Sequence, residues 1–544
     1  MARLARPLDS LKSRYDAIVI GSGYGGSVAA ARLARGGKRV AVLERGREFA
    51  TGEFPSRFSD LRKEMRVTGR SFSSGPDTAL YDVRLGEDMH VLVGCGLGGG
   101  SLINAGVALR PDSRVFSDDV WPGQIAQDGL LDQGYAEARR WLRPARSARA
   151  PELTKFQALK SSSTALGVEP IVPEVVISFE DTINPAGIAQ TACTLCGDCC
   201  AGCNVGAKNT MALTYLPYAA SHGAEIFTHL KVQHIAQDKS GGWIVHAERL
   251  DAAAPKGAGN LALSANIVVI AAGTLGSTEI LLRSRANGLQ VSDRLGERFS
   301  ANGDIIAFGY GATLPVNAIG VGHPPKIADF PVGASVSGQI ELDDDDDLAN
   351  EICIQEGAMP SALAPVLPVM FLPNGRLLGA LQSLVSGVYK GPFAHLQTFF
   401  AVSHDSAAGR FRLEGDRLTL SWPGAADEPV YRRLDAALGT LVAKAGGRYV
   451  KNPLAGTVMG HQPATAHPLG GCGMGHARDD GVVSHKAQVF KGGQKAGSTD
   501  VHDGLYVIDG SIIPRSLGVN PLLTITALAE RSLLHMARDL NLCF

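Results

Sequence analysis

Five cysteines stand close together in one segment of the chain. In the stretch ACTLCGDCCAGCN, Cys193, Cys196, Cys199 and Cys203 are separated by two, two and three residues, and Cys200 adds a fifth thiol. Bacterial ferredoxins use this spacing for the cysteines that ligate iron–sulfur clusters. The same thiols could instead form a zinc site, a redox-active C-x-x-C disulfide or ordinary reduced cysteines. The spacing predicts an iron–sulfur cluster held by the four cysteines and leaves these alternatives open.

The cysteine run differs from a ferredoxin run in two respects. Asn204 follows the last cysteine, where ferredoxins have proline, and the chain contains a single run, whereas ferredoxins share ligands between two. The fourth ligand could therefore come from a distant cysteine, or the cluster could contain three irons. The distant candidates are Cys95, Cys353 and Cys472.

A glycine motif lies near the amino terminus, in a strand–glycine–helix–strand pattern over residues 15–44. Gly21, Gly23 and Gly26 have the spacing G-x-G-x-x-G, and the second strand ends at Glu44. In a βαβ unit these glycines permit a tight turn, close approach of the backbone to a pyrophosphate, and helix–sheet packing. The acidic residue accepts hydrogen bonds from the adenosine ribose, which disfavours NADP. The motif predicts a dinucleotide site and does not distinguish FAD from NAD.

Four further segments, far apart in the sequence, match one family in their order along the chain. They are residues 93–107, 268–284, 467–475 and 505–531. These segments resemble the glucose–methanol–choline (GMC) family of flavin oxidoreductases, and within it the cholesterol oxidase branch. The resemblance covers almost the whole chain. It implies FAD bound in an extended form, with the isoalloxazine ring beneath a second domain.

The motifs and the resemblance together indicate the residues that hold this cofactor. Glycines 98–100 provide a surface without side chains, and Asn104 provides an amide beside it. Pro521 opens an apolar helix whose positive end would stabilise negative charge on the reduced ring. The predicted cofactor-binding residues are Gly21, Gly23, Tyr24, Gly25, Gly26, Glu44, Gly94, Gly98, Gly99, Gly100, Ser101, Asn104, Ala272, Gly273, Asp509, Gly510, Asn520, Pro521 and Leu522.

The resemblance also implies a catalytic pair. Removal of a hydride from a carbinol carbon leaves a protonated carbonyl unless the hydroxyl proton departs too, so the site needs a base. His467 occupies the histidine of the family's H-P-x-G-G motif, and Asn520 its second polar position. We expect His467 to accept the proton and Asn520 to orient the hydroxyl. The alternatives are a histidine that only caps a turn, and His461 as a less economical base.

A carboxylate is the third predicted catalytic group. In sterol oxidases of this family a glutamate moves a proton during double-bond isomerisation, and the matching stretch is ICIQEGAMP, residues 352–360. Glu356 is the candidate, although an ungapped comparison places Gln355 at the glutamate position. If Glu356 faces away from the site, the enzyme would oxidise alcohols without isomerising them.

The elements that position these residues predict an α/β fold. A Rossmann-like, doubly wound FAD-binding domain is assembled from discontinuous segments, residues 12–50, 85–125, 204–300 and 460–544. A substrate domain, largely an antiparallel sheet, is inserted as residues 51–84, 126–203 and 301–459, and includes the cysteine-rich segment 193–203. Five aspartates at 343–347 lack the ligand spacing of a calcium loop and predict a solvated turn.

Composition excludes several other classes. The 52 basic and 53 acidic residues nearly cancel, so no nucleic-acid partner is expected. No apolar run is long enough for a signal peptide or a membrane span, which predicts a cytoplasmic enzyme and leaves peripheral membrane contact open. G-x-S-x-G, Walker A and H-E-x-x-H motifs are absent from the sequence, which disfavours hydrolase, NTPase and metalloprotease functions.

The predicted function is FAD-dependent oxidation of a hydrophobic secondary alcohol, such as a 3-hydroxysteroid or a terpenoid, to a ketone. Apolar residues of the stretch 362–400 could line the substrate pocket. Electrons would pass to oxygen, or to a redox protein or quinone if the cysteines hold a cluster. The alternatives are an electron-transfer or redox-sensor flavoprotein, and an FAD enzyme that acts on a substrate other than an alcohol.

Overall fold

The computed structural model describes residues 3–251, 259–323, 331–371, 387–451, 460 and 462–543. The predicted βαβ unit is present as β1 (Arg14–Ile20), α1 (Tyr24–Arg35) and β2 (Val40–Leu43). The two strands pair in parallel, and all four residues of β2 are buried. Parallel strands made of apolar residues are covered on both faces of their sheet, and here the flanking helices cover them.

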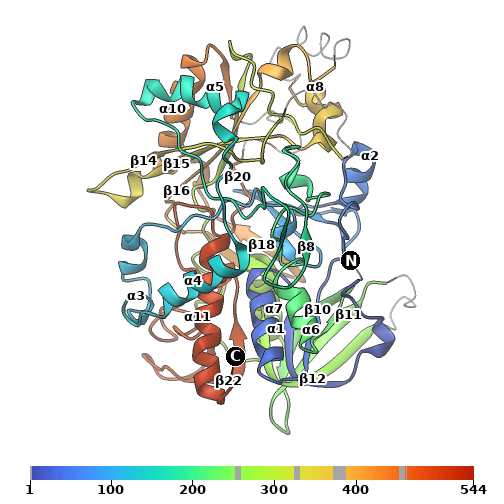
Figure 1. The fold of residues 1–544 in the computed structure, drawn as a ribbon. Coiled ribbons are helices and arrows are strands. Elements are labelled where there is room, and N and C mark those ends of the chain that lie inside the picture. The colour runs from blue at the N-terminus through green and yellow to red at the C-terminus, as the bar shows by residue number, and fades with distance from the viewer. Residues whose placement is uncertain are drawn as a thin grey trace.

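The unit belongs to an eight-stranded sheet in the lower half of the molecule (Figure 1). Its parallel core runs in the order β22-β12-β1-β2-β9, and β10 and β11 continue from β12 in antiparallel pairing. The strands come from three distant parts of the chain, which confirms a Rossmann-like fold built from discontinuous segments. The added strands are β9 (Glu225–Phe227), β10 (Leu230–Gln237), β11 (Trp243–Arg249), β12 (Asn260–Ile270), β21 (Gln488–Phe490) and β22 (Val501–Val507).

Three strands of the parallel core end at the same edge of the sheet, where ligands bind in open α/β folds. After β1 the chain turns through glycines into α1, and after β12 it enters α7 (Gly273–Ala286). After β22 it passes through a short turn toward α11 (Leu522–Leu540). Helix α1 packs between α6 (Tyr215–Ser221) and α11, which in turn packs on α4 (Leu130–Leu142) (Figure 1).

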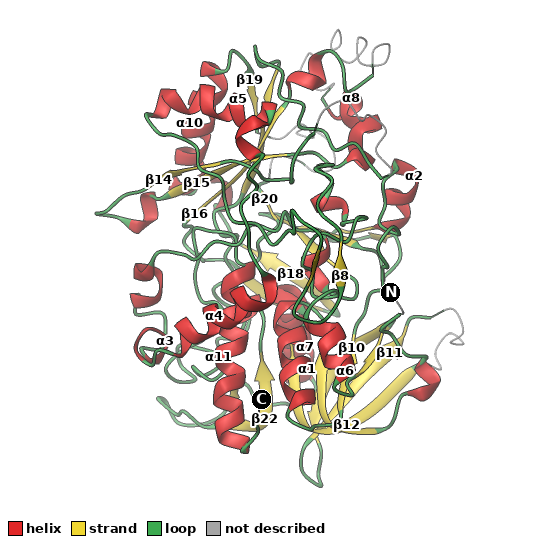
Figure 2. Ribbon diagram, viewed as in Figure 1, coloured by secondary structure: helices red, strands yellow, loops and turns green. Residues whose placement is uncertain are grey.

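A second sheet forms the upper half of the molecule, in the order β14-β15-β16-β13-β19 (Figure 2). All its pairs are antiparallel, as predicted for the inserted domain. Helices α5 (Thr154–Ser163) and α10 (Pro429–Lys444) pack on this upper sheet. Its strands are β13 (Ile305–Tyr310), β14 (Gln339–Leu342), β15 (Ile352–Gly357), β16 (Gln397–Ser403) and β19 (Arg448–Val450).

Smaller elements connect the two halves. A five-stranded sheet has the order β20-β6-β5-β3-β4, and β17 and β18 form a hairpin. These strands are β3 (Met65–Thr68), β4 (Ser73–Ser74), β5 (Tyr81–Leu85), β6 (His90–Gly94), β17 (Arg410–Glu414), β18 (Arg417–Ser421) and β20 (Ala464–Thr465), with short helices α2 (Phe58–Leu61), α3 (Gln124–Gln127) and α8 (Leu367–Met370).

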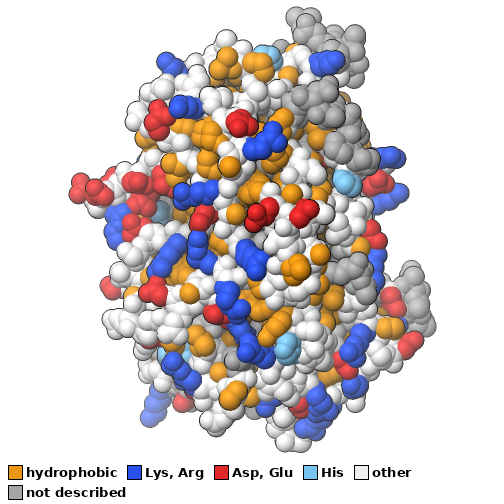
Figure 3. Space-filling view, viewed as in Figure 1, with side chains coloured by type: hydrophobic (Ala, Val, Ile, Leu, Met, Phe, Trp, Pro, Cys, Tyr) orange, Lys and Arg blue, Asp and Glu red, His pale blue; other side chains and the backbone are white. Residues whose placement is uncertain are grey.

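The surface carries charges of both signs without a continuous basic face in the view shown (Figure 3). Acidic side chains gather at the projecting tip between β14 and β15, where the five consecutive aspartates form the predicted turn. Within the described parts of the chain, every helix is too short or too polar to cross a lipid bilayer.

Candidate active site

A large cavity lies at the carboxyl edge of the eight-stranded sheet and extends beneath the upper sheet. Its volume is about 1000 Å³. Three helices begin at its wall: α1 after Gly23, α7 at Gly273 and α11 after Pro521. Free N–H groups and positive dipole ends at helix starts attract anionic groups. The cavity therefore suits a large ligand that carries phosphates and can take up further negative charge.

The glycines of the G-x-G-x-x-G motif divide into two kinds. Gly21 has a φ of 92°, and a Cβ at this residue would overlap the backbone of Ala271. A Cβ at Gly26 would overlap the carbonyl of Gly21, so both glycines are required for packing. At Gly23, in contrast, no atom lies within 4 Å of where a Cβ would be. This open space beside a helix start is where a pyrophosphate would approach the backbone.

Glu44 is held at the cavity wall by short hydrogen bonds. Its Oε2 accepts a hydrogen bond from Ser22 Oγ at 2.5 Å, and its Oε1 accepts one from the Gly46 amide at 2.8 Å. The carboxylate lines the cavity although the residue is only 6% exposed. Oε2 also accepts from the Ser22 amide at 3.1 Å. Oε1 keeps an acceptor lone pair, so Glu44 is placed as a ribose-binding residue requires.

Asn104 extends the polar wall next to a second glycine turn. Its Nδ2 donates to the Tyr24 hydroxyl at 2.6 Å, whereas its Oδ1 is buried without a hydrogen-bond partner among the described residues. Gly99 packs against Gly23, and Gly100 faces open space. A buried acceptor without a donor indicates a missing ligand, so these residues fit the FAD that the sequence motifs predict.

Asp509, one of the predicted cofactor-binding residues, lines the cavity with both carboxylate oxygens hydrogen-bonded within the protein. Its Oδ1 accepts from the amide and hydroxyl of Ser511, and its Oδ2 accepts from the amide of Gly273 and the hydroxyl of Ser277. Burial raises the pKa of Asp509, and these four donors oppose the shift. The carboxylate fastens the end of β22 to the start of α7 and acts on the cavity through the backbone that it holds.

Most of the predicted cofactor-binding residues are brought together by the fold. Gly25, Gly26, Gly98 and Ser101 lie behind the wall, where the Ser101 hydroxyl donates to the Gly98 carbonyl at 2.6 Å. The predicted residues that line the cavity are Gly21, Gly23, Tyr24, Glu44, Gly94, Gly99, Gly100, Asn104, Ala272, Gly273, Asp509, Gly510, Asn520, Pro521 and Leu522.

His467 and Asn520 also meet at the cavity, within a chain of polar contacts. The Nδ2 of Asn520 lies 3.5 Å from the Nε2 of His467. On the far side of the imidazole, Nδ1 lies 3.2 Å from Oδ2 of Asp304, whose side chain is 2% exposed. The Nε2 of Gln355 donates to Oδ1 of Asn520 at 2.6 Å. All four residues line the cavity.

This arrangement defines which atoms face a bound alcohol. With its Nδ1 next to a carboxylate, His467 can hold a proton there and present an unprotonated Nε2 to the cavity. The Oδ1 of Asn520 is taken by Gln355, so its Nδ2 is the atom left to donate toward Nε2 or toward a substrate oxygen. Asp304 itself is held by the amide of Ala466 at 2.7 Å and the hydroxyl of Thr465.

Glu356 does not join this group. It lies on β15 next to Gln355, and successive side chains of a strand point to opposite faces of its sheet. Gln355 lines the cavity, while Glu356 turns toward α5, where its Oε2 lies 2.9 Å from the Nζ of Lys155. The Ser337 amide donates to its Oε1 at 2.8 Å. Burial raises the pKa of Glu356, and the Lys155 ammonium opposes the shift.

Sequence reasoning missed Asp304 and underrated Gln355. The ungapped comparison already placed Gln355 at the position of the family's glutamate, so its signal was present. Asp304 stands directly before the apolar strand β13 and carries no motif, so only the fold reveals its contact with His467. His461 lies outside the described residues.

The five clustered cysteines are divided between two cavities. Cys193, Cys196, Cys199 and Cys203 line one small enclosed cavity, which we call the cysteine cavity. Cys200 instead lines the large cavity. All five are free cysteines. Burial raises the pKa of Cys196 to about 12.

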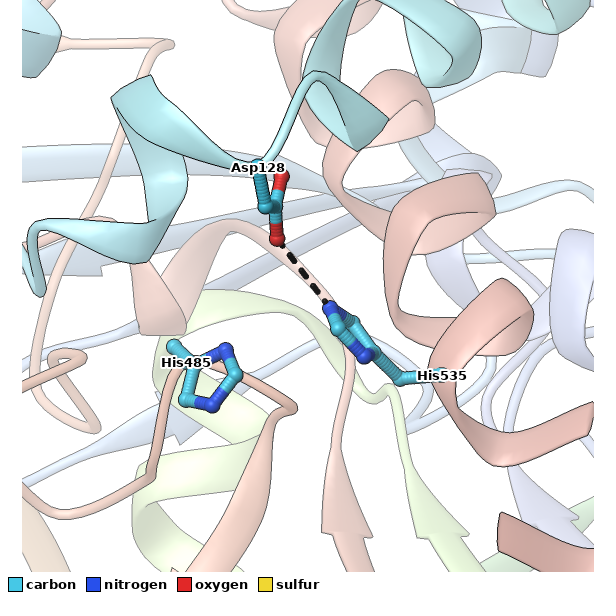
Figure 4. Close-up of side chains that lie close together, drawn as sticks. All are labelled: Asp128, His485 and His535. Atoms are coloured by element: carbon cyan, nitrogen blue, oxygen red, sulfur yellow. Dashed lines mark hydrogen bonds and ion pairs between the residues drawn. The ribbon is translucent and has the colours of Figure 1, made fainter. Parts of the chain in front are cut away.

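A second group of potential ligands contains Asp128, His485 and His535 (Figure 4). The Nε2 of His535 lies 3.3 Å from Oδ2 of Asp128. Arg531 is fully buried beside them, and its Nη2 contacts both Oδ2 of Asp128 at 2.5 Å and Nδ1 of His485 at 3.3 Å. This guanidinium already compensates the carboxylate, so the group is explained as an ion-pair network.

A parallel sheet with glycine turns at its carboxyl edge, roofed by an antiparallel sheet, defines a class of dinucleotide-binding oxidoreductases. The chain belongs to the GMC oxidoreductase family, whose amino-terminal profile matches residues 15–301 and whose carboxyl-terminal profile matches residues 452–529. Membership implies FAD as the cofactor, in agreement with the residues of the large cavity.

Curated relatives match over most of the chain. A cholesterol oxidase of Mycobacterium tuberculosis is 28% identical over 96% of this chain and 91% of its own length. A cholesterol oxidase of Acinetobacter baumannii is 27% identical over 96% of this chain and 94% of its own length. A long-chain-alcohol oxidase of Arabidopsis thaliana is 24% identical over 96% of this chain and 67% of its own length.

Solved structures share the fold. Pyridoxine 4-oxidase from Mesorbium loti superposes with a TM-score of 0.59 at 18% identity, covering 96% of this chain and 99% of that protein. A fungal aryl-alcohol oxidase gives a TM-score of 0.58 at 14% identity, covering 98% of this chain and 100% of that protein. The fold class is therefore confirmed.

Proposed function

We propose that this chain is an FAD-dependent enzyme that oxidises a hydrophobic secondary alcohol to a ketone. The observation that carries the proposal is the meeting of His467 Nε2 and Asn520 Nδ2, 3.5 Å apart, at the wall of the large cavity. When bound, FAD supplies the acceptor for the hydride at its N5. The curated relatives that match over most of this chain are named as oxidases of cholesterol and of long-chain alcohols, which supports the same class of reaction here.

The protein's own residues would handle the hydroxyl proton. His467 Nε2 takes the proton from the alcohol oxygen as the carbon–hydrogen bond breaks, and Asn520 Nδ2 donates to that oxygen. Asp304 then lies next to an imidazolium and stabilises its charge. Asn520 and Gln355 hold each other in place, so the oxygen meets a fixed donor and a fixed acceptor.

The hydrophobic character of the substrate is argued from the walls around this pair. Ile306 and Phe308 of β13 and Phe400 of β16 line the large cavity, as do Met359 and Leu363. Desolvation of such a wall favours a bulky apolar alcohol, such as a 3-hydroxysteroid or a terpenoid. Leu363 and Phe400 belong to the apolar stretch predicted to line the pocket, of which residues 372–386 lie outside the described structure.

The placement of Glu356 supports oxidation without isomerisation. A proton shuttle must face the substrate, and this carboxylate is instead paired with Lys155 behind the upper sheet. We therefore propose that a 3-hydroxysteroid with a neighbouring double bond would leave with that double bond in its original position.

Product analysis tests this function. The FAD-loaded protein is incubated with a 3-hydroxysteroid, a terpenoid secondary alcohol and a long-chain primary alcohol, and products are identified by mass spectrometry and NMR. Ketone formation from the first two is expected. Hydrogen peroxide released in equal amount would identify oxygen as the acceptor, whereas turnover only with an added quinone or redox protein would identify a dehydrogenase. Oxidation of none of the three would contradict the proposal.

A further inference from the structure

The cysteine cavity lies directly behind the large cavity. Cys199 and Cys200 are adjacent in the chain, yet Cys199 lines the small cavity and Cys200 the large one, so this segment borders both spaces. The free volume of the cysteine cavity is about 10 Å³. That is too small for an organic ligand and suits a group bonded directly to the walls.

We propose that the cysteine cavity binds a four-iron iron–sulfur cluster through Cys193, Cys196, Cys199 and Cys203, with Lys208 beside it as a charge-compensating residue. The ligand set follows from the division of the thiols, because all four cysteines at the ferredoxin spacing face one space and the fifth faces away. The distant candidates Cys95, Cys353 and Cys472 are not part of this wall. A single run therefore supplies all four ligands.

The separation of the sulfur atoms disfavours a single zinc ion. Tetrahedral zinc with bonds of about 2.3 Å requires thiolate sulfurs about 3.8 Å apart. Among the residues that the structure describes, no three cysteine sulfurs lie within 4.8 Å of one another. In a cuboidal cluster each cysteine ligates a different iron atom, so its sulfurs lie farther apart than those around one ion.

Backbone amides already point at the sulfurs. The amide of Leu195 donates to the Sγ of Cys193 at 3.4 Å, and the amide of Ser335 donates to the Sγ of Cys199 at 3.4 Å. Hydrogen bonds of this kind stabilise the charge of a cluster and raise its reduction potential. Ser335 lies 136 residues beyond Cys199, so two separate segments of the chain contribute to this site.

Lys208 connects the two cavities. It is 1% exposed, and its Nζ donates to the carbonyls of Leu102, Asn104 and Cys199 at 2.8, 2.9 and 2.8 Å. The first two belong to the glycine turn of the large cavity, and the third belongs to the cysteine run. Lys208 also lines the cysteine cavity, where an ammonium would offset part of the negative charge of four ligating thiolates.

The consequence for the reaction concerns the route of the electrons. Oxidation of one alcohol releases two electrons and two protons, and a cluster carries one electron at a time. The two electrons would therefore leave in two steps to a one-electron acceptor, such as a redox protein, while the protons pass to solvent. This consequence rests on the proposed alcohol oxidation, whereas cluster binding itself does not.

Metal analysis of the anaerobically purified protein tests the proposal. We expect about four iron atoms and four acid-labile sulfides per chain, no zinc, and an electron paramagnetic resonance signal after reduction with dithionite. Cys199→Ala should lose iron and sulfide, and Cys200→Ala is the matched control that should keep both. Lys208→Gln should lower the midpoint potential of the signal. FAD content and circular dichroism report whether each variant is folded.

Zinc, or a protein without metal after anaerobic purification, would overturn the proposal, and so would equal iron loss in both cysteine variants. The result of this metal analysis can be distinguished from the result of the test of the proposed function. A protein that oxidises alcohols without iron overturns the cluster alone, and one that holds iron but oxidises no alcohol overturns the substrate assignment alone.

Discussion

The two faces of the upper sheet carry neighbouring residues with opposite tasks. On the face toward the large cavity, Gln355 holds Asn520, which meets His467. On the face toward α5, the next residue, Glu356, forms an ion pair with Lys155. Both faces are buried, and both carry polar networks. One step along the strand separates a residue that contacts the site from one that stabilises the fold.

The difference teaches that burial and a shifted pKa do not by themselves mark a catalytic group. Burial raises the pKa of Glu356, which is a common property of general acids and bases. Its partner is a lysine within the protein, and the carboxylate does not reach the cavity. Asp304, in contrast, contacts His467, whose Nε2 faces Asn520. Direction toward the cavity decides between the two carboxylates.

The largest expected effect is the loss of the base. His467→Ala should slow reduction of the bound flavin by an alcohol about 1000-fold, because proton removal by a positioned base contributes rate factors of this order. Stopped-flow absorbance under anaerobic conditions measures this rate. His222, an exposed histidine directly after the end of α6, provides the control, and His222→Ala should react like the original protein. Similar rates in both variants would remove His467 from the mechanism.

Asp304→Asn should cost less, about 100-fold in the same rate. The amide carries no charge to stabilise an imidazolium, while its Oδ1 can still accept from the donors that Oδ2 of Asp304 now accepts from. FAD content should stay unchanged. An unaltered rate in a variant that binds FAD normally would show that the 3.2 Å contact with His467 is structural only.

The matched pair on β15 tests the two faces directly. Gln355→Leu should lower the rate of flavin reduction about tenfold, because Asn520 loses the donor that fixes its amide. Glu356→Gln should change that rate less than about twofold, yet lower the free energy of unfolding by about 3 kcal/mol, since Lys155 would keep a buried charge without its partner. Denaturant titration measures the second effect. The opposite pattern would reverse the assignment of the two faces.

The smallest effect concerns a buried histidine that lies off the cavity wall. Burial lowers the pKa of His404 to about 4, while an unfolded histidine titrates near 6.5. Its contribution to stability is present above about pH 6.5 and is lost as the pH falls toward 4, because the unfolded chain binds the proton first. His404→Gln should make stability less pH-dependent in this range by up to about one proton. Denaturant titrations at several pH values test this, and an unchanged dependence would contradict it.

Much of the cofactor domain could be predicted because its signals are local. The glycine spacing, the apolar strands and Glu44 all lie within one βαβ unit, so residues that are close in the sequence are also close in the structure. The contact between Asp304 and His467 joins residues 163 positions apart and has no periodic signal. For Glu356, the residue type was identified, but the face of its strand depends on the register of the upper sheet.

The most direct test of the account is an anaerobic absorbance titration of the FAD-loaded protein with hydrophobic alcohols, 3-hydroxysteroids among them. We predict that at least one secondary alcohol bleaches the flavin band completely, and that a ketone appears in equal amount. A flavin that stays oxidised with every alcohol, yet is reduced by another electron donor, would contradict alcohol oxidation and favour an electron-transfer flavoprotein.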